Sequence, residues 1–328
     1  MLLRKESLTK SKNLLAFSAG VDSTALLFLL LENKIQFDIA IVDYGLRLQS
    51  KEEVKYAQEL ALKYNFTCHL LNAETITSNF EANARTLRYN FFEKLIAQHK
   101  YENLLTAHHL GDRFEWMLMQ FCKGAGCAEL SGMSESEKRS NYTLIRPLLH
   151  LDKQELLSYL NAGKMTYFID ESNEDSKYKR NEFRHKFSNP LLQKHLSGIK
   201  KSFKYMDEDV KTLILECEVL ESKELSYFKS SSSKRSDIFY IDKILKSKGI
   251  LISANEREQL KESVALVVGR KYIVNQEHGF VFVAPYIKVD KIPKELKERL
   301  RLLHVEPKLR GYLASDVETL ELVSLVLA

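Results

Sequence analysis

Short apolar runs alternate with longer amphipathic stretches over residues 13–149. The runs LLAFS, DIAIVD and NLLTAHH are short and end in polar or glycine residues, which predicts buried strands. The stretches STALLFLLLENK, KEEVKYAQELALKYN and ANARTLRYNFFEKLIAQHK have helical spacing and helix-favouring residues. Strand–helix alternation predicts an α/β fold with a parallel, doubly wound sheet. Because ligands bind beyond the carboxyl ends of such strands, we look for chemistry in the polar residues that end each run.

The pattern changes after residue 149. NYTLIRPLLHLDKQELLSYLNAG predicts a short strand and then a helix capped by Asp152. A densely charged stretch, residues 170–192, separates the α/β part from a mostly helical segment that reaches about Leu225. Residues 230–233 read as a linker or exposed loop. Beyond them we expect a small α+β region with helices, a hairpin that turns near residues 277–279, and an amphipathic helical tail.

Composition limits the class of protein. The 328 residues are 45% hydrophobic and 28% charged, which suits a globular chain of about two domains. A net charge of +5 is compatible with a polyanionic partner without requiring one. The four cysteines show no Cys-x-x-Cys spacing, so we expect free thiols rather than disulfides or a metal site. The amino terminus lacks the apolar core of a secretory signal and no run is long enough for a membrane span, which predicts a soluble, cytoplasmic protein.

Six small and polar residues, SAGVDS, interrupt the first apolar region: Ser18, Ala19, Gly20, Val21, Asp22 and Ser23. A phosphate at the start of a helix needs free backbone N–H groups and gains from the helix dipole. Gly20 permits close approach, the serines offer hydroxyl donors, and Asp22 suits magnesium better than phosphate. A Walker loop is excluded because its lysine is absent. The alternative is a plain strand-to-helix turn with Ser or Asp as N-cap.

Two further segments carry polar residues at expected strand ends or on helix faces. VDYGLR closes the second strand, which places Asp43 at the carboxyl edge of the sheet, either beside the first loop or in an ordinary solvated turn. EANARTLRY places Glu81, Arg85 and Arg88 on one side of a helix. Surface pairing between Glu81 and Arg85 would explain that segment equally well.

The segment AHHLGDRFEWMLMQFCKGAG has more specific content. Asp112 and Glu115 share a face at the start of a helix, where they serve as dipole partners or as a site for a cationic substrate. The paired histidines have no third ligand at metal spacing, which argues against zinc. KGAG, beginning at Lys123, is a flexible basic turn suited to phosphate or nucleic acid. In the charged stretch, Arg180, Asn181 and Arg184 lie close in sequence to aromatic residues. This mixture is typical of contacts with phosphates and bases. The alternative is a charged loop exposed to solvent.

The order of these segments resembles the tRNA(Ile)-lysidine synthase family of PP-loop, or N-type, ATP pyrophosphatases. SAGVDS, VDYGLR, EANARTLRY, AHHLGDRFEWML…KGAGCAELSGM, RPLL and DESNEDSKYKRNEFRHKFSNPLL carry the resemblance over residues 13–192. The sequence departs from the family pattern at Ala19, where glycine is usual, and at five other positions: Tyr44, Gly111, Arg113, Trp116 and Lys123. A methyl group at position 19 is tolerable if the backbone there is not left-handed.

The resemblance implies a Rossmann-like catalytic domain at residues 1–192, a helical connector at 193–225 and a tRNA-binding domain at 226–328. It implies ATP and Mg²⁺ as cofactors. The implied partners are L-lysine and a tRNA(Ile) with a CAU anticodon. A homodimer is compatible with the resemblance. In the implied reaction, ATP adenylates the carbon-2 oxygen of the wobble cytidine and pyrophosphate leaves. Lysine then displaces AMP to form lysidine, which changes the codon read from AUG to AUA.

The resemblance also assigns roles to individual residues. Residues 18–23 hold ATP, with Asp22 as a magnesium ligand; Asp43, Asp112 and Glu115 are catalytic, and Asp112 and Glu115 bind lysine. The residues expected to bind tRNA or the adenylate are Arg85, Arg88, Lys123, Arg146, Arg180, Asn181 and Arg184. Two other interpretations remain. One is a different PP-loop enzyme such as a tRNA thiolase, for which Cys122 and Cys127 have the wrong spacing; the other is a non-catalytic RNA-binding protein.

Overall fold

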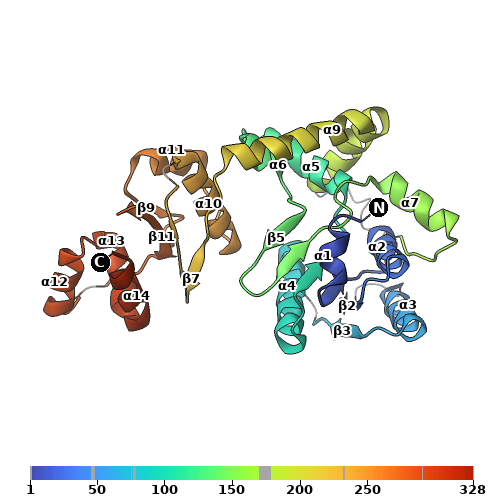
Figure 1. Cartoon of the computed structure of the whole chain (residues 1–328), viewed down its shortest axis with the longest axis horizontal. Helices are drawn as coiled ribbons and strands as arrows, with labels where there is room; N and C mark the ends of the chain where they lie inside the picture. The colour runs from blue at the N-terminus through green and yellow to red at the C-terminus, as the bar shows by residue number, and fades with distance from the viewer. Residues whose placement is uncertain are drawn as a thin grey trace. The chain divides into compact units, whose positions relative to one another are not determined.

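The computed structural model describes residues 2–45, 49–74, 76, 79–169, 179–231, 233–289 and 291–327. The chain divides into two compact units, Met1–Met206 and Asp207–Ala328, and the boundary falls within helix α9 (Asn189–Leu213). Each unit is built around its own sheet (Figure 1). The domain limits expected at residues 192 and 225 stay predictions.

A six-stranded sheet forms the centre of the first unit, in the order β3-β2-β1-β4-β6-β5. All neighbouring pairs are parallel except β5 with β6, which confirms the parallel α/β fold predicted from the alternation. The strands are β1 (Asn13–Ala16), β2 (Phe37–Asp43), β3 (Cys68–Asn72), β4 (Asn103–Leu105), β5 (Ser136–Lys138) and β6 (Thr143–Ile145).

Helices cover both faces of this sheet. Leu15 of β1 belongs to the core shared with α2, whereas its neighbour Leu14 packs in the core that contains Phe92 of α4. Successive strand residues point to opposite faces, so these two cores lie on opposite sides. The helical elements of this unit, besides α9, are α1 (Lys5–Thr9), α2 (Val21–Glu32), α3 (Gln49–Tyr64), α4 (Phe80–His99), α5 (Leu110–Phe121), α6 (Cys127–Ser131), α7 (Lys153–Ala162), α8 (Lys179–Phe183) and the π-helix η2 (Arg184–Ser188).

The strand order fixes where a ligand can bind. From β1 the chain proceeds outward to β2 and β3, and then returns to place β4 on the other side of β1. The carboxyl ends of β1 and β4 therefore flank a topological switch point, where loops turn away from one another and leave a crevice. The loop after β1 carries SAGVDS, and the loop after β4 carries the two histidines.

Capping fixes the start of α7 as the sequence predicts. The Asp152 side chain accepts a hydrogen bond from the backbone N–H of Glu155 at 2.9 Å, and the Glu155 carboxylate accepts one from the backbone N–H of Asp152 at 2.8 Å. This reciprocal pair is a capping box. Glu155 also accepts a bond from Lys200 Nζ at 2.7 Å, which joins α7 to α9.

The second unit contains a five-stranded antiparallel sheet in the order β7-β8-β11-β10-β9. Its expected hairpin is confirmed, with Glu277 of β10 opposite Phe280 of β11. The elements are β7 (Leu220–Ser222), β8 (Leu225–Lys229), β9 (Ala265–Val268), β10 (Tyr272–Glu277), β11 (Phe280–Pro285), α10 (Lys234–Ser247), α11 (Ala254–Glu262), α12 (Lys294–Leu302), α13 (Pro307–Ser315) and α14 (Val317–Leu327).

One expectation about the segment before this sheet is wrong. The helical segment ends at Leu213 rather than near 225, because the alternating and aromatic residues that follow form β7 and β8. Of the two alternatives for residues 230–233, a linker or an exposed loop, the described residues 230, 231 and 233 form a loop between β8 and α10, and residues 230 and 231 are half-buried rather than exposed. Ser230 Oγ and Ser231 N–H donate to the Asp237 carboxylate at 2.6 and 3.1 Å, which ties this loop to α10.

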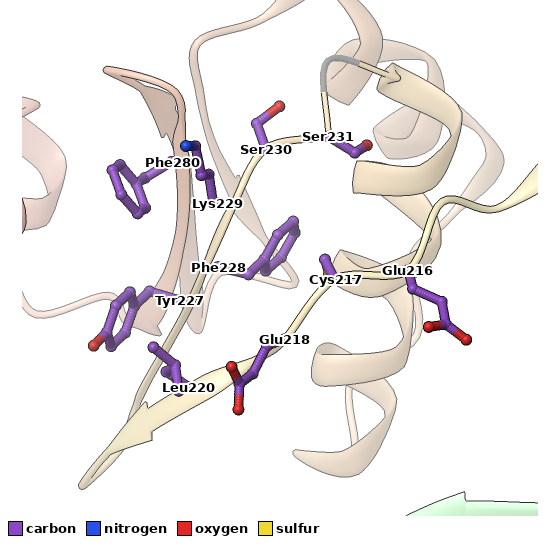
Figure 2. Close-up of a pocket in the computed structure, with 10 residues that line it drawn as sticks. All are labelled: Glu216, Cys217, Glu218, Leu220, Tyr227, Phe228, Lys229, Ser230, Ser231 and Phe280. Atoms are coloured by element: carbon purple, nitrogen blue, oxygen red, sulfur yellow. The ribbon is translucent and has the colours of Figure 1, made fainter.

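A hollow of about 360 Å³ lies beside β8 in the second unit (Figure 2). Figure 2 shows Tyr227 and Phe280 on one side of the strand and Phe228 directed toward Cys217 on the other. The carboxylates of Glu216 and Glu218 belong to the same lining. Lys229 lines it as well, so the hollow carries two acidic side chains and one basic side chain.

Among the described residues, none of the helices combines the length and the apolar character needed to cross a membrane.

Candidate active site

The loop after β1 is held by its own serine hydroxyls. The backbone N–H of Ser18 donates to Ser23 Oγ at 3.2 Å, the two hydroxyls lie 3.1 Å apart, and Ser23 Oγ donates to the carbonyl of Gly20 at 3.2 Å. Gly20 is the N-cap of α2 and has no side-chain cap, so the first N–H groups of this helix are left for a ligand. The geometry suits a phosphate group.

The backbone of Phe168 also binds this loop. The backbone N–H of Phe168 donates to the carbonyl of Ala19 at 2.9 Å, and Gly20 forms an isolated parallel bridge with Phe168. Ala19 itself has φ of 57°, in the left-handed region, and its side chain is fully buried. The condition under which a methyl group at position 19 would be free of strain is therefore not met, and Ala19 carries strain that a glycine would not.

Replacing Ala19 by glycine should change the free energy of unfolding by less than about 1 kcal/mol. Relief of the left-handed strain, about 1–2 kcal/mol, is offset by the lost burial of a methyl group, about 0.8 kcal/mol, and by the greater chain entropy of glycine. Ala19→Val should instead destabilise by more than about 2 kcal/mol, since a branched side chain is strained at positive φ and has no room. Urea unfolding measures both, and equal stability of the two variants would contradict the left-handed assignment.

Asp22 has an unusual carboxylate. Its Oδ1 is buried and has no hydrogen-bond partner within the described part of the chain, while Oδ2 lies 3.9 Å from His109 Nε2 and 4.0 Å from Lys153 Nζ. No group of three or more His, Cys, Asp or Glu side chains suited to a metal occurs in the same residues. Magnesium in nucleotide sites needs only one or two carboxylates besides phosphates and water, so one orphaned oxygen fits this ion.

The loop after β4 begins α5 with a histidine cap. His109 Nδ1 accepts the backbone N–H of Gly111 at 2.9 Å, and Asp112 Oδ2 accepts the backbone N–H of His109 at 3.1 Å. His109 Nε2 lies 3.7 Å from Asp112 Oδ2 and 3.9 Å from Asp22 Oδ2. One imidazole thus stands between the phosphate-type loop and the carboxylates of α5.

His108 is held in its neutral form. Its Nδ1 lies 2.9 Å from Thr106 Oγ1, and burial lowers the pKa of His108 to about 4. The charges of Arg146, Arg180 and Arg85 also lower this pKa, whereas Asp112 opposes them. At neutral pH the imidazole adds no charge to the site.

Asp112 and Glu115 share two arginines. Arg180 Nε bonds Glu115 Oε1 and its Nη2 donates to Asp112 Oδ1 at 3.2 Å. Arg184 Nε donates to Glu115 Oε2 at 2.8 Å, and its Nη2 lies 3.5 Å from Asp112 Oδ1. The Glu115 side chain is 1% exposed and that of Asp112 is 14% exposed. These four side chains, here named the four-charge cluster, confirm that the two carboxylates share one face.

The balance of charge keeps Asp112 ionised. Burial alone would raise the pKa of Asp112, but the neighbouring His109, His108 and Arg180 side chains and the hydrogen bond from the His109 backbone outweigh it and lower the pKa. The sequence favours Arg180 and Arg184 as ligands of tRNA or the adenylate. The structure instead places both on the carboxylates.

The remaining predicted residues lie around this centre in different surroundings. Asp43 ends β2 at the same sheet edge, where its Oδ1 accepts the backbone N–H of Gly45 at 2.8 Å. Arg85 and Arg88 are exposed on α4, and the guanidinium of Arg85 lies 4.9 Å from the ring centre of Tyr89. Lys123 is exposed in the turn after α5.

Other predicted residues are buried in the protein. Arg146 donates to the carbonyl of Ser134 at 2.8 Å and to Glu137 at 3.2 Å, so its guanidinium holds the β5 hairpin. Asn181 is also buried. Residues 46–47 and 170–178, to which the family motifs extend, and the side chain of Glu81 lie outside the described residues.

Tyr44 and Arg113 depart from the family pattern, and each side chain joins neighbouring elements of the fold. Tyr44 OH donates to the carbonyl of Ala84 at 3.2 Å, which joins the end of β2 to α4. Arg113 points away from the acidic pair: Nε and Nη2 donate to the carbonyl and hydroxyl of Ser131 at 2.9 and 3.1 Å, and the guanidinium lies 4.4 Å from the ring centre of Phe203. Arg113 therefore joins α5 to α6 and α9.

Arg113→Met should lower the free energy of unfolding by about 2–4 kcal/mol, since a buried carbonyl loses its donor and a desolvated cation–π contact is lost. Arg113→Lys should recover only part of this loss, because an ammonium cannot reproduce the planar fork. Thermal or urea unfolding measures the change. Lys123→Met, in an exposed turn of the same unit, is the control. A loss below about 0.5 kcal/mol, the usual size for surface changes, would contradict the buried clamp.

A glycine-containing loop and an uncapped helix start at the switch point of a parallel sheet define a PP-loop nucleotide-binding protein. The family model described as a PP-loop domain matches residues 2–191. The chain belongs to the tRNA(Ile)-lysidine synthase family of ATP-dependent ligases, as its relatives show. It is 45% identical over 313 residues to tRNA(Ile)-lysidine synthase of Wolinella succinogenes, covering 95% of each chain. It is 41% identical to that of Helicobacter pylori strain 26695, covering 95% of this chain and 92% of the relative.

Among solved structures, the U34-tRNA thiolase NcsA from Methanococcus maripaludis, with its [4Fe-4S] cluster, matches with a TM-score of 0.52 at 17% identity. The match covers 65% of this chain and 76% of the thiolase, and supports the fold alone. All four cysteines of the present chain are described and free.

Proposed function

We propose that the chain ligates free L-lysine to carbon 2 of the wobble cytidine in the CAU anticodon of tRNA(Ile), using ATP and forming lysidine. The position of His109 carries this proposal. Its Nε2 lies 3.9 Å from Asp22 and 3.7 Å from Asp112, so the ATP loop and the acidic pair form one site rather than two. A reaction that first activates a base with ATP and then adds an amino acid needs this adjacency.

In the first step, the carbon-2 oxygen of cytidine attacks the α-phosphorus of ATP and pyrophosphate leaves. The loop of residues 18–23 and the start of α2 hold the departing pyrophosphate through backbone N–H groups and the Ser18 hydroxyl. Magnesium, when bound, supplies positive charge that stabilises the leaving group, and Asp22 would hold it through its orphaned oxygen.

In the second step, the neutral side-chain amine of lysine attacks carbon 2. The carbon–oxygen bond to the adenylate breaks, AMP leaves, and the amine loses a proton. Asp112 and Glu115 bind the amino acid, and Asp43 at the adjacent strand end contributes a third carboxylate to the edge. His108 is neutral, so it leaves the charge balance around the carboxylates unchanged.

We propose that exposed basic side chains contact the tRNA. Arg85, Arg88 and Lys123 lie in the unit that carries the site, and their exposed charges suit phosphate contacts. Arg146 and Asn181 were also expected to bind tRNA or the adenylate, but both are buried and the Arg146 guanidinium is bonded to Ser134 and Glu137, so we assign neither a ligand contact. The tRNA body is assigned to residues 226–328, with residues 193–225 as connector. A cytoplasmic location and a homodimer stay predictions.

The test is ATP-dependent incorporation of labelled lysine into unmodified tRNA(Ile) with a CAU anticodon, with methionine tRNA of the same anticodon as control. Incorporation into the first RNA alone would support the proposal. ATP cleavage to AMP without incorporation would replace lysine ligation by another PP-loop chemistry, such as thiolation. Tight RNA binding without ATP turnover would favour a non-catalytic RNA-binding protein.

A further inference from the structure

Trp116, the one tryptophan in the sequence, lies exposed at the edge of the candidate active site. It follows Glu115 on α5 and is 39% exposed, whereas the three residues before it are at most 5% exposed. It is not a member of the four-charge cluster, and it departs from the family pattern. Tryptophan is among the side chains most enriched at binding hot spots, so its exposure here raises the question of which ligand covers it.

The position of the indole is fixed by the residues beneath it. Gly132 follows α6 with φ of 69° and ψ of −124°, a conformation that residues with a side chain rarely adopt. A Cβ atom on Gly132 would lie 2.9 Å from Cδ1 of Trp116, so the ring packs directly on the glycine backbone. The buried guanidinium groups of Arg113 and Arg146 bond the backbone carbonyls one position before and two positions after this glycine. A ring held in this way loses little further freedom when a ligand binds it.

Trp116 lies on a line of side chains that begins at the acidic pair. A helix turns by about 100° per residue, so Asp112 and Trp116, four positions apart, share one side of α5. Cys122, the C-cap, keeps right-handed helical torsions, so the exposed Lys123 continues the same line. The other side of α5 packs on α9 through Leu110, Phe114, Met117 and Leu118. The line therefore offers a carboxylate, an indole and an ammonium, in that order, away from α9.

The order of these groups matches a single RNA strand that enters the site. A cytosine that reacts at carbon 2 must be unstacked and presented singly, so each flanking base loses a stacking partner. An indole about 6 Å along α5 from Asp112, the rise of four helical residues, can replace that partner. Every base has a π face that stacks on an aromatic side chain. Lys123 adds the cation that suits a phosphate of the same strand.

We propose that Trp116 stacks on a base that flanks the wobble cytidine, while Lys123 contacts a phosphate of the same strand. The indole then holds the anticodon loop so that the cytidine reaches the start of α5. This inference rests on the proposed function and assigns a contact that orients its RNA substrate. A second copy of the chain is the competing occupant. The cores of protein interfaces are depleted in charge, however, and Trp116 lies between the charged side chains of Asp112 and Lys123.

The first experiment uses the wild-type chain, in which tryptophan emission reports on Trp116 alone. An unmodified anticodon stem-loop of tRNA(Ile) should quench most of this emission at saturation, because a stacked base covers the indole. Two further stem-loops lack the base on the 5′ side or the 3′ side of the wobble cytidine, and one of them should bind without the quench. Filter binding measures the occupancy of each RNA. A complete stem-loop that binds without quenching, or a quench that survives in both base-deleted RNAs, would overturn the proposal.

The second experiment measures KM for each substrate. Trp116→Ala should raise KM for tRNA about 5- to 150-fold, the equivalent of about 1–3 kcal/mol for one stacked base, and leave KM for lysine and for ATP unchanged. Trp116→Phe keeps an aromatic face and should restore most of the affinity, which also guards against misfolding. Phe121→Ala removes a 65% exposed ring from the other side of the same helix and should change none of the three constants. Equal rises in all three constants for Trp116→Ala, or an unchanged KM for tRNA, would overturn the proposal.

Two further measurements separate this inference from its alternatives. If tryptophan emission changes with protein concentration in the absence of RNA, and sedimentation shows a dimer, Trp116 lies between two copies of the chain and the proposal is overturned. Incorporation of labelled lysine by the wild-type chain is measured in the same series. The proposed function fails if that incorporation is absent, whereas the present inference fails if incorporation persists and bound RNA leaves the emission unchanged.

Discussion

Glu115→Gln should lower lysine incorporation by about 100- to 1,000-fold while ATP-dependent adenylation, followed as pyrophosphate release, continues. A change of this size corresponds to about 3–4 kcal/mol, which lies within the cost of losing one partner of a buried charge pair at a binding site. Glu115 is 1% exposed and bonds both arginines, and glutamine keeps its shape but not its charge. The effect belongs to the second step because no hydrogen bond joins Glu115 to the loop after β1 in the described residues.

The matched control is Glu59→Gln on α3, where a 61% exposed carboxylate pairs with Lys55 at 3.8 Å, and both rates should be unaffected. Pyrophosphate release and labelled-lysine incorporation are measured on the same preparations, with urea unfolding to compare stability. A Glu115→Gln protein that folds and incorporates lysine at the wild-type rate would remove the four-charge cluster from the lysine site.

Asp22→Asn should impair the first step of the reaction rather than the second. The rate of pyrophosphate release should fall about 100-fold or more. The free energy of unfolding should stay the same or rise by up to about 1 kcal/mol. Asp22 Oδ1 is buried without a partner in the described residues, and His109 Nε2 and Lys153 Nζ lie 3.9 and 4.0 Å from Oδ2. A poorly compensated carboxylate costs the folded state energy, and an amide removes that cost. The same oxygen is the one proposed to hold magnesium, so its loss should stop activation by ATP.

Asp38→Asn provides the reciprocal control. Asp38 accepts the backbone N–H of Thr67 at 2.7 Å and the hydroxyl of Tyr101 at 2.6 Å, at the amino-terminal edge of the sheet. Its loss should destabilise by about 1–3 kcal/mol without changing the rate of pyrophosphate release. Thermal unfolding and the magnesium dependence of the rate distinguish the two variants. An Asp22→Asn protein with normal magnesium dependence would exclude Asp22 as a ligand.

The fold was predictable where hydrophobic burial dominates. The strands β1, β2 and β4 are largely buried and stand out as apolar runs. β3 lies at the sheet edge, and its residues are half-buried or exposed, so CHLLN carries a weak signal. β8 follows a long polar helix and was included in a helical segment, although four of its five residues are buried. Sheet partners distant in sequence supply that burial, and local pattern does not reveal them.

The site was predictable as a set of residues but not as a set of contacts. Strand topology was enough to bring the loop after β1 and the start of α5 together. The direction of the Arg113 side chain could not be predicted from strand topology. Each step along a helix turns the side chain by about 100°, so a residue next to Asp112 faces other helices. The pairing of Arg180 and Arg184 with α5 joins segments 65 or more residues apart, which spacing within one motif does not indicate. The left-handed backbone of Ala19 lies beside a hydrogen bond from Phe168, a residue distant in sequence, and the local pattern indicates neither feature.

The contact between Phe168 and the ATP loop has a consequence for how ligands communicate. Phe168 is anchored to the loop at one end of a short piece of chain, and Arg180, bound to the carboxylates, is twelve positions further along. The covalent chain thus connects the end of the site proposed for phosphate with the end proposed for the amino acid. Thermodynamic linkage makes any communication along it reciprocal. By whatever factor bound ATP changes the affinity for lysine, bound lysine changes the affinity for ATP by the same factor.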